Sequence, residues 1–169
     1  CFARGGDSCV DFDILYGFRP NVLLPRVRAL MLHAIRGLRL CCGIAGGPNC
    51  RSFSPARKTV RPREDPMGDN ELDPEVRAYL EDENVLFTFY AALCREAFRQ
   101  GLEYLMENPT DLGDALSLLF RPGRARSASV FITPPLLELV EETGGVAITG
   151  PQCKTFGTPW RKLTTWLAS

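Results

Sequence analysis

The cysteines are the side chains of this sequence best suited to hold a soft metal or to act as nucleophiles. The chain of 169 residues contains seven cysteines, and five of them lie in its first third. Those five are Cys1, Cys9, Cys41, Cys42 and Cys50. Their spacing matches no common zinc signature, and an odd number completes no disulfide framework. We therefore expect reduced thiols and no metal site, with Cys94 as a small residue of an apolar core.

A single histidine, His33, limits the catalytic chemistry that this sequence can support. It lies in an arginine-rich stretch, so residues 72–169 cannot form a Ser-His-Asp, Cys-His or His-Glu-x-x-His arrangement. The glycine-rich stretch from Gly43 to Gly47 also lacks the Lys-Ser or Lys-Thr ending of a phosphate-binding loop. The sequence thus predicts a protein that is not an enzyme and that binds no cofactor.

One short motif is typical of a modification site. Ser129 follows Arg124 and Arg126 at a spacing that resembles the sites of basophilic kinases. The alternative role for the same basic loop, residues 121–127, is direct contact with phosphate groups. We treat Ser129 as a candidate phosphorylation site.

Charge divides the chain into two parts, although its formal net charge is zero. Residues 1–63 contain eleven Arg or Lys and three Asp, a net charge of +8. Residues 64–169 contain nine basic and seventeen acidic residues, a net charge of −8. Such an asymmetry indicates segments with different roles. We divide the chain into a basic N-terminal extension at 1–53, a proline-rich linker at 54–71 and an acidic domain at 72–169.

The basic extension contains a predicted amphipathic helix over residues 22–40, with apolar side chains on one face and arginines on the other. An arginine-rich, acid-free and serine-containing segment of this kind resembles a mitochondrial transit peptide. Arg36 and Arg39 lie in the helix. The sequence Arg51-Ser52-Phe53-Ser54 is similar to the sites at which such peptides are removed in the matrix, so the mature chain is expected to start near Ser54.

The resemblance implies a mitochondrial location, in the matrix or on the matrix face of the inner membrane. The targeting residues would then be Arg36, Arg39, Arg51, Phe53 and Ser54. The alternative is a retained basic arm that lies on an acidic protein, a nucleic acid or a lipid surface. No apolar run reaches the ~18 residues needed to span a bilayer, so any membrane contact is expected to be peripheral.

The acidic domain is predicted to begin with one long helix. Asp73 is a good N-cap, and Pro74 suits the first helical position. Apolar residues recur at helical spacing as far as Leu105, and the helix is expected to run to about Asn108, before Pro109. Such a helix would be about 50 Å long.

Shorter elements are expected to complete the domain. They are a short helix from Thr110 to Phe120, a helix from Thr133 to Gly144, a strand at 146–149 paired with 129–132, and a final helix from Thr158 containing Trp160 and Trp166. The predicted fold class is mainly α, or α+β if the single two-stranded pairing forms. It is a small helical domain built on one long helix.

The long helix is also the expected partner interface. The three shorter helices are too small to cover it, so part of its apolar stripe should stay exposed. The rings of Phe87, Tyr90 and Phe98 are the expected energetic centre of the interface. Trp160 and Trp166 form a second candidate near the C-terminus.

These features favour a non-catalytic accessory subunit of a mitochondrial inner-membrane respiratory-chain or ATP-synthase complex, with other subunits as its partners. Acidic residues 81–83 would select a basic partner. The second interpretation is a mitochondrial ribosomal or RNA-associated subunit that binds RNA through the basic arm. After residue 53 the chain has thirteen basic and seventeen acidic residues, a net charge of −4, which disfavours contact with phosphate backbones. The third is a small assembly factor or an enzyme of unrecognised type.

Overall fold

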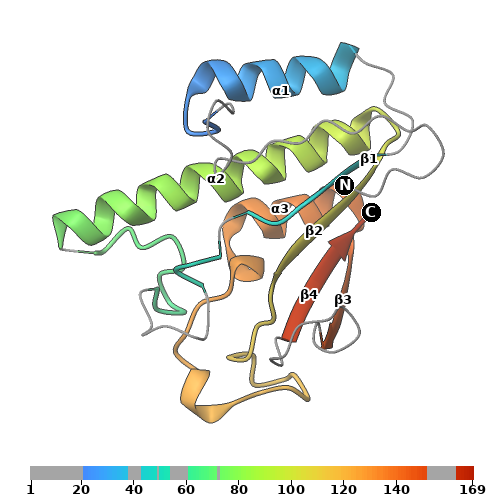
Figure 1. Ribbon diagram of the computed structural model, residues 1–169. Helices are drawn as coiled ribbons and strands as arrows, with labels where there is room; N and C mark the ends of the chain where they lie inside the picture. The colour runs from blue at the N-terminus through green and yellow to red at the C-terminus, as the bar shows by residue number, and fades with distance from the viewer. Residues whose placement is uncertain (1–20, 38–42, 49, 54–60, 72, 152–162) are drawn as a thin grey trace.

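The fold combines helices with a sheet. The computed structural model describes residues 21–37, 43–48, 50–53, 61–71, 73–151 and 163–169. Within these ranges the chain forms three α-helices and one four-stranded mixed sheet (Figure 1). The fold class is therefore α+β, and the prediction of a mainly helical domain built on one long helix is wrong. Two segments that were expected to be helical are strands of the sheet.

The sheet has the strand order β1-β2-β4-β3. Its strands are β1 (Gly43–Gly46), β2 (Glu103–Pro109), β3 (Val146–Pro151) and β4 (Leu163–Ala168). β1 runs parallel to β2, whereas β4 is antiparallel to both β2 and β3. A parallel pair needs a long connection, and helix α2 lies in the connection between β1 and β2. Among the described strands, β1 and β3 form the two edges.

Helix α2 (Pro74–Arg99) begins where the sequence predicts and ends earlier. The Asp73 carboxylate accepts two backbone hydrogen bonds from the first turn, at 2.9 and 3.2 Å. After the helix, Gly101 has a φ of 71°, and the N–H of Leu102 donates to the carbonyl of Ala97 at 2.9 Å. This left-handed ending favours glycine, because a Cβ is strained there. The helix therefore does not continue toward Asn108.

Strand β2 takes the place of the last predicted turns of the long helix. Its side chains alternate: Tyr104, Met106 and Asn108 are buried, while Leu105 is 41% exposed. A period of two residues is the pattern of a strand with one buried face. Leu105 also fits the helical spacing of the preceding apolar residues, which explains why the sequence predicted a continued helix.

Strand β4 replaces the predicted final helix. Thr164, Thr165 and Trp166 are β-branched or aromatic residues, which suit a pleated surface better than an isolated helix. Leu167 enters the core with 1% of its surface exposed. Trp160, which was expected in the same helix, lies outside the described residues.

The region between β2 and α3 also differs from the prediction. Residues 110–120 form hydrogen-bonded turns instead of a short helix. The strand at 146–149 is confirmed within β3, but its partner is β4. Residues 129–132 do not pair with it, since Val130–Ile132 form the 3-10 helix η2. Another short 3-10 helix, η1 (Pro122–Arg124), follows the turns.

Helix α3 (Pro134–Thr143) confirms the prediction for this segment. It starts after Thr133 and ends at Gly144, whose φ of 66° forms the expected left-handed cap. Leu136 and Leu139 on its buried side pack into the main core.

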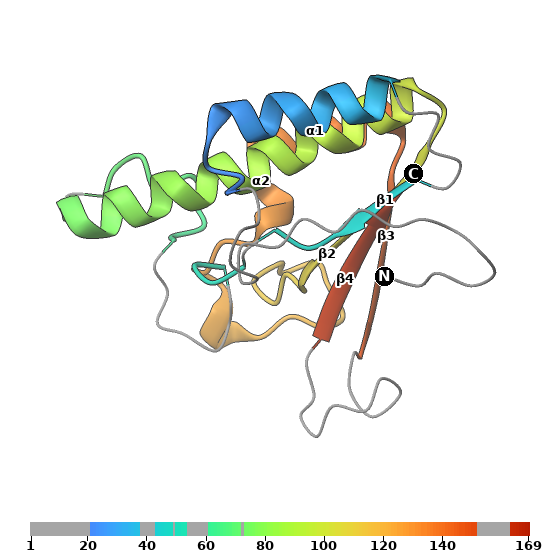
Figure 2. The same ribbon diagram turned by 45° about the horizontal axis from the view of Figure 1, so that its top comes forward.

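Helices α2 and α3 cover one face of the sheet, which we call the inner face (Figures 1 and 2). The buried residues of the main core are Phe53, Phe87, Ala91, Cys94, Tyr104, Met106, Ala128, Val130, Leu136, Leu139 and Leu167. Cys94 is fully buried, as predicted, and this burial raises the pKa of its thiol to about 12.

Helix α1 (Pro25–Gly37) is the predicted basic amphipathic helix, and it lies along α2 (Figure 2). Ile35 packs in a second buried cluster with Phe89 and Leu93 of α2. At the same contact, the Arg36 guanidinium lies 2.9 Å from the Glu96 carboxylate. Apolar packing and one ion pair thus join the basic segment to the acidic domain.

Candidate partner-binding site

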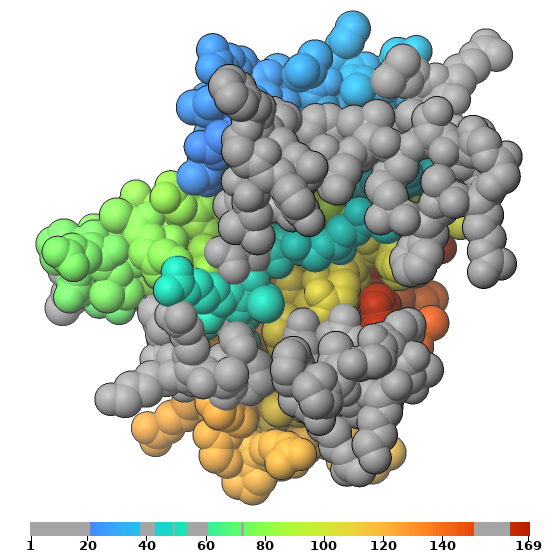
Figure 3. All heavy atoms as spheres, viewed as in Figure 1, coloured from blue at the N-terminus to red at the C-terminus, as the bar shows by residue number. Residues whose placement is uncertain are grey.

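The face of the sheet turned away from α2 and α3 carries exposed apolar side chains. We call it the outer sheet face and define it by Ala45, Leu105, Val146, Ile148, Trp166 and Ala168, with the acidic residues Glu103 and Glu107. Val146 and Ile148 are each 61% exposed, and Leu105 is 41% exposed. In Figure 3, atoms of β2 in yellow and of β4 in red reach the surface on the side turned to the viewer.

Strand register makes these side chains neighbours. Leu105 pairs with Ala168, which pairs with Val146, so the three form one row across β2, β4 and β3. Trp166 lies in the next row with Ile148 as its partner on β3. Directly opposed side chains on one face lie within contact distance, so the rows form a continuous apolar surface.

Two glycines, one in β1 and one in β3, show which residues of these strands lie on each face of the sheet. A Cβ at Gly46 would lie 3.0 Å from the ring of Tyr90, so the small residue lets β1 approach α2 on the inner face. A Cβ at Gly150 would lie 3.5 Å from the Trp166 ring, which places that indole on the outer sheet face.

Strand β3 has the sequence Val-Ala-Ile-Thr-Gly-Pro, without a charged residue. Edge strands of soluble proteins are commonly protected by charged side chains, because an open edge can pair with another chain. Within the described part of the chain, β3 pairs only with β4. Its other edge and its exposed Val146 and Ile148 are suited to contact an extended segment of a partner.

The charged residues of the outer sheet face are acidic. Glu103 is exposed and Glu107 is half-buried, and both come from β2. The described residues of the four strands include no Lys or Arg. A partner that presents apolar side chains with Lys or Arg beside them would therefore complement this surface.

The structure does not bring Phe87, Tyr90 and Phe98 together on an exposed surface. Phe87 is fully buried, with its ring centroid 5.6 Å from that of Phe53 in an edge-to-face contact. The Tyr90 hydroxyl donates to the carbonyl of Leu105 at 2.9 Å, and burial raises the pKa of this phenol. Phe98 is 42% exposed near the end of α2. Two of the three rings thus contribute mainly to packing inside the protein.

The acidic residues 81–83, which were predicted to select a basic partner, do not share one environment. Glu81 and Asp82 are exposed, whereas Glu83 is 2% exposed and faces the buried Arg61. Of the two predicted tryptophans, Trp166 lies on the outer sheet face, half-buried, and Trp160 lies outside the described residues.

The predicted targeting residues lie in different environments. Arg36 pairs with Glu96 while remaining largely exposed. Arg51 is exposed, with its guanidinium 5.7 Å from the centre of the Tyr79 ring. Phe53 is 6% exposed and belongs to the main core. Arg39 and Ser54 lie outside the described residues.

The candidate phosphorylation site, Ser129, is only 4% exposed. Its hydroxyl accepts a hydrogen bond from the N–H of Phe131 at 3.3 Å and caps η2. A kinase would require this segment to open before it could reach the oxygen.

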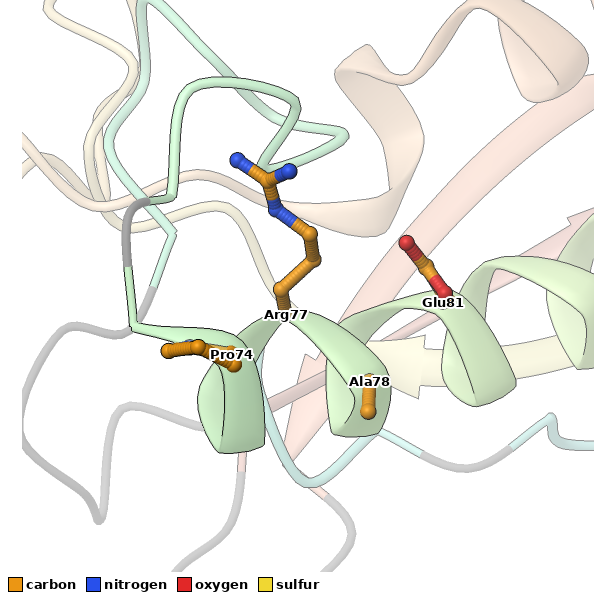
Figure 4. A pocket seen from close by; sticks show the side chains of 4 residues that line it. All are labelled: Pro74, Arg77, Ala78 and Glu81. Carbon is orange, nitrogen blue, oxygen red and sulfur yellow. The ribbon is translucent and has the colours of Figure 1, made fainter.

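A shallow hollow lies on the first turns of α2, lined by Pro74, Arg77, Ala78 and Glu81 (Figure 4). Its volume of about 190 Å³ is below the ~300 Å³ at which small-molecule sites usually begin. Arg77 extends toward the loop before the helix, where its Nε donates to the Glu71 carbonyl at 2.9 Å. This hollow is therefore a surface feature of the helix start.

In the described ranges, no group of three or more His, Cys, Asp or Glu side chains is arranged to hold a metal ion. No helix in those ranges is both long and apolar enough to cross a membrane.

No protein-family model, curated protein or solved structure significantly matches this chain.

Sequence reasoning missed Leu105, Val146 and Ile148 as surface residues of one site. The segment Glu103–Asn108 gives little local indication of a strand, because Tyr104, Leu105 and Met106 are three consecutive apolar or aromatic residues and do not alternate with polar ones. The pairing of that segment with β4, and of β4 with β3, joins parts of the chain that are distant in sequence and has no local signal.

Proposed function

We propose that this protein is a non-catalytic accessory subunit of a mitochondrial inner-membrane assembly, and that it binds a neighbouring subunit through the outer sheet face. The observation that supports this proposal most directly is the exposure of Val146 and Ile148, at 61% each, beside Leu105 and Trp166 on one face of the sheet. Contiguous apolar surface that is rimmed by polar residues is typical of binding sites.

The expected occupant is a segment of a partner subunit with apolar and basic side chains. Apolar side chains would cover Val146 and Ile148 and exclude water, which supplies most of the affinity. Basic side chains would lie near Glu103 and contribute mainly to specificity and association rate.

The mitochondrial part of the proposal rests on α1, whose arginines and apolar stripe resemble a targeting helix. We further infer that residues 43–53 remain in the mature protein after import. Removal of the chain before Ser54 would take away strand β1 and the Phe53 ring that packs on Phe87. Peptides spanning 43–53 should therefore be found by mass spectrometry in the protein isolated from mitochondria, whereas a chain starting at Ser54 would contradict retention.

The docking proposal is tested by native electrophoresis of detergent extracts from mitochondria that contain the tagged full chain. The wild type should migrate with a large assembly, and mass spectrometry should identify its neighbours. Val146→Glu with Ile148→Glu adds two charges to a face that is already acidic, so this variant should migrate alone.

The matched control is Leu137→Glu with Val140→Glu, which alters two exposed apolar residues of α3. This control should stay with the assembly, and circular dichroism should show that both variants are folded. Migration of the wild type by itself, or equal release of the sheet and α3 variants, would contradict the proposed interface.

A further inference from the structure

The segment of residues 111–121, called here the leucine loop, presents two aliphatic side chains almost entirely to solvent. Leu116 is 95% exposed and Leu118 is 105% exposed on a scale relative to the residue's reference surface. Leu119 follows at 36%. The loop lies at the end of the molecule opposite α1 (Figure 1). It is separate from the outer sheet face, so its role does not depend on that proposed interface.

Hydrogen bonds hold the leucine loop in this shape. The N–H of Arg121 donates to the carbonyl of Leu112 at 2.8 Å and so joins the two ends of the loop, which we call its neck. Inside the loop, the Asp114 carboxylate accepts the N–H of Leu116 at 2.9 Å. The Ser117 hydroxyl oxygen accepts a further backbone N–H, two residues later, at 3.1 Å. The leucines are thus directed outward by a formed turn structure.

The neck of the loop is fixed to the body of the protein. The Arg63 guanidinium lies 2.8 Å from the Asp111 carboxylate, and the backbone N–H of Arg63 donates to the carbonyl of Arg126 at 2.9 Å. A Cβ at Gly113 would lie 2.5 Å from the Arg124 carbonyl oxygen, so the chain passes close to itself here. The position of the leucines is therefore set by packing at the base of the loop.

Basic residues lie directly beside the leucine loop. Arg121, Arg124 and Arg126 are three of the nine basic residues in 64–169, a part of the chain whose net charge is −8. Arg121 and Arg126 are exposed. Of the two acids in the loop, Asp111 pairs with Arg63, and the Asp114 carboxylate accepts the N–H of Leu116. The end of an otherwise acidic domain is thus locally basic.

We propose that the leucine loop inserts Leu116 and Leu118 into the surface of an anionic lipid bilayer, while Arg121 and Arg126 contact the lipid phosphates. Aliphatic side chains beside arginines match the apolar and charged layers of such a surface. A protein partner is less well matched, since interface centres are enriched in Trp and Tyr and the two leucines stand on a protruding loop. The charge of the arginines selects anionic over neutral lipid.

The test is co-sedimentation of the purified full chain with vesicles of phosphatidylcholine and phosphatidylserine in equal parts, compared with phosphatidylcholine alone. The wild type should bind the anionic vesicles and not the neutral ones. Leu116→Ser with Leu118→Ser should weaken this binding at least ~10-fold, because two side chains lose their transfer into lipid. Arg121→Gln with Arg126→Gln should weaken it and reduce its dependence on salt.

Two control variants separate this loop from other surfaces. Leu137→Ser alters a leucine of α3 that is 53% exposed, and it should leave vesicle binding unchanged. Leu30→Ser with Arg26→Gln alters the exposed side of the basic helix α1, and the binding should largely persist.

Three results would overturn the lipid proposal: no binding to anionic vesicles, undiminished binding of the Leu116→Ser, Leu118→Ser variant, or loss only in the α1 variant. If the loop variants keep vesicle binding but leave the mitochondrial assembly, the loop is a protein contact instead. The proposal for the outer sheet face is tested independently, by the migration of the Val146→Glu, Ile148→Glu variant in detergent extracts.

Discussion

The guanidinium of Arg61 lies 3.8 Å from the carboxylate of Glu83, and both side chains are excluded from solvent. Arg61 also donates to the Ser52 hydroxyl at 2.6 Å and to the carbonyls of Pro66 and Met67 at 3.0 and 2.9 Å. Burial lowers the pKa of Arg61, and the charge of Glu83 opposes this shift. The pair therefore ties Ser52 and residues 61–67 to helix α2.

We predict that Glu83→Leu lowers the free energy of unfolding by about 3–5 kcal/mol, because it leaves the Arg61 charge buried without its counter-ion. The double variant Arg61→Met, Glu83→Leu should recover much of that loss, since it removes both charges. Urea denaturation of the single and double variants measures the difference. Glu81→Leu on the exposed side of the same helix is the control and should have a small effect. A double variant that is no more stable than Glu83→Leu alone would show that charge pairing with Arg61 is not the main contribution of Glu83 to the free energy of unfolding.

The parts of the fold that sequence reasoning predicted correctly have local causes. Asp73 caps α2 through its own first turn, and Gly144 ends α3 through its own backbone conformation. The glycine-rich strand β1 has no local cause of this kind. It forms only because residues 43–46 pair with residues 103–106 of β2. The outer sheet face depends in the same way on register between distant segments, so its composition could not be predicted from either segment alone.

The backbone conformation of Gly101 explains why α2 does not continue to Asn108, as the sequence had predicted. Its φ of 71° ends α2, and nothing lies within 4 Å of the position that a Cβ would take. Gly101→Ala should therefore cost about 1 kcal/mol of stability from backbone strain alone. Gly123→Ala is the matched control, because it also has open space but no positive φ, and it should be nearly neutral. Thermal and urea unfolding measure both, and an equally neutral Gly101→Ala would mean that the helix can extend past residue 101.

The targeting prediction can be tested apart from the fold. Residues 31–60 fused to a fluorescent protein should carry it into mitochondria, because the basic helix responds to the membrane potential. Arg36→Glu with Arg39→Glu should abolish import of this reporter, whereas Arg57→Glu with Lys58→Glu, outside the helix, should not. The short fusion is needed since Arg36 also pairs with Glu96 in the full chain. A reporter that stays in the cytosol, or import that is indifferent to the helix variant, would rule out targeting by this segment.

The same ion pair makes the contact between α1 and α2 sensitive to acid. A hydrogen bond from Arg36, followed by one from Gln100, lowers the pKa of the Glu96 carboxyl below its ordinary value of 4.5. A carboxyl whose pKa is lowered in the folded state stabilises that state above its unfolded pKa. This contribution is lost as the pH falls through the folded value. Arg36 is largely exposed, so the contribution is small.

Glu96→Gln should therefore be less stable than the wild type at neutral pH, and the difference should shrink as the pH falls below about 4.5. Urea midpoints across this range measure it, with Glu81→Gln as an exposed control on the same helix. In an Arg36→Gln background the ion pair with Glu96 is absent, so the part of the difference due to Arg36 should disappear. A Glu96→Gln effect that is the same in both backgrounds, at every pH, would mean that the Arg36–Glu96 contact between α1 and α2 does not form in solution.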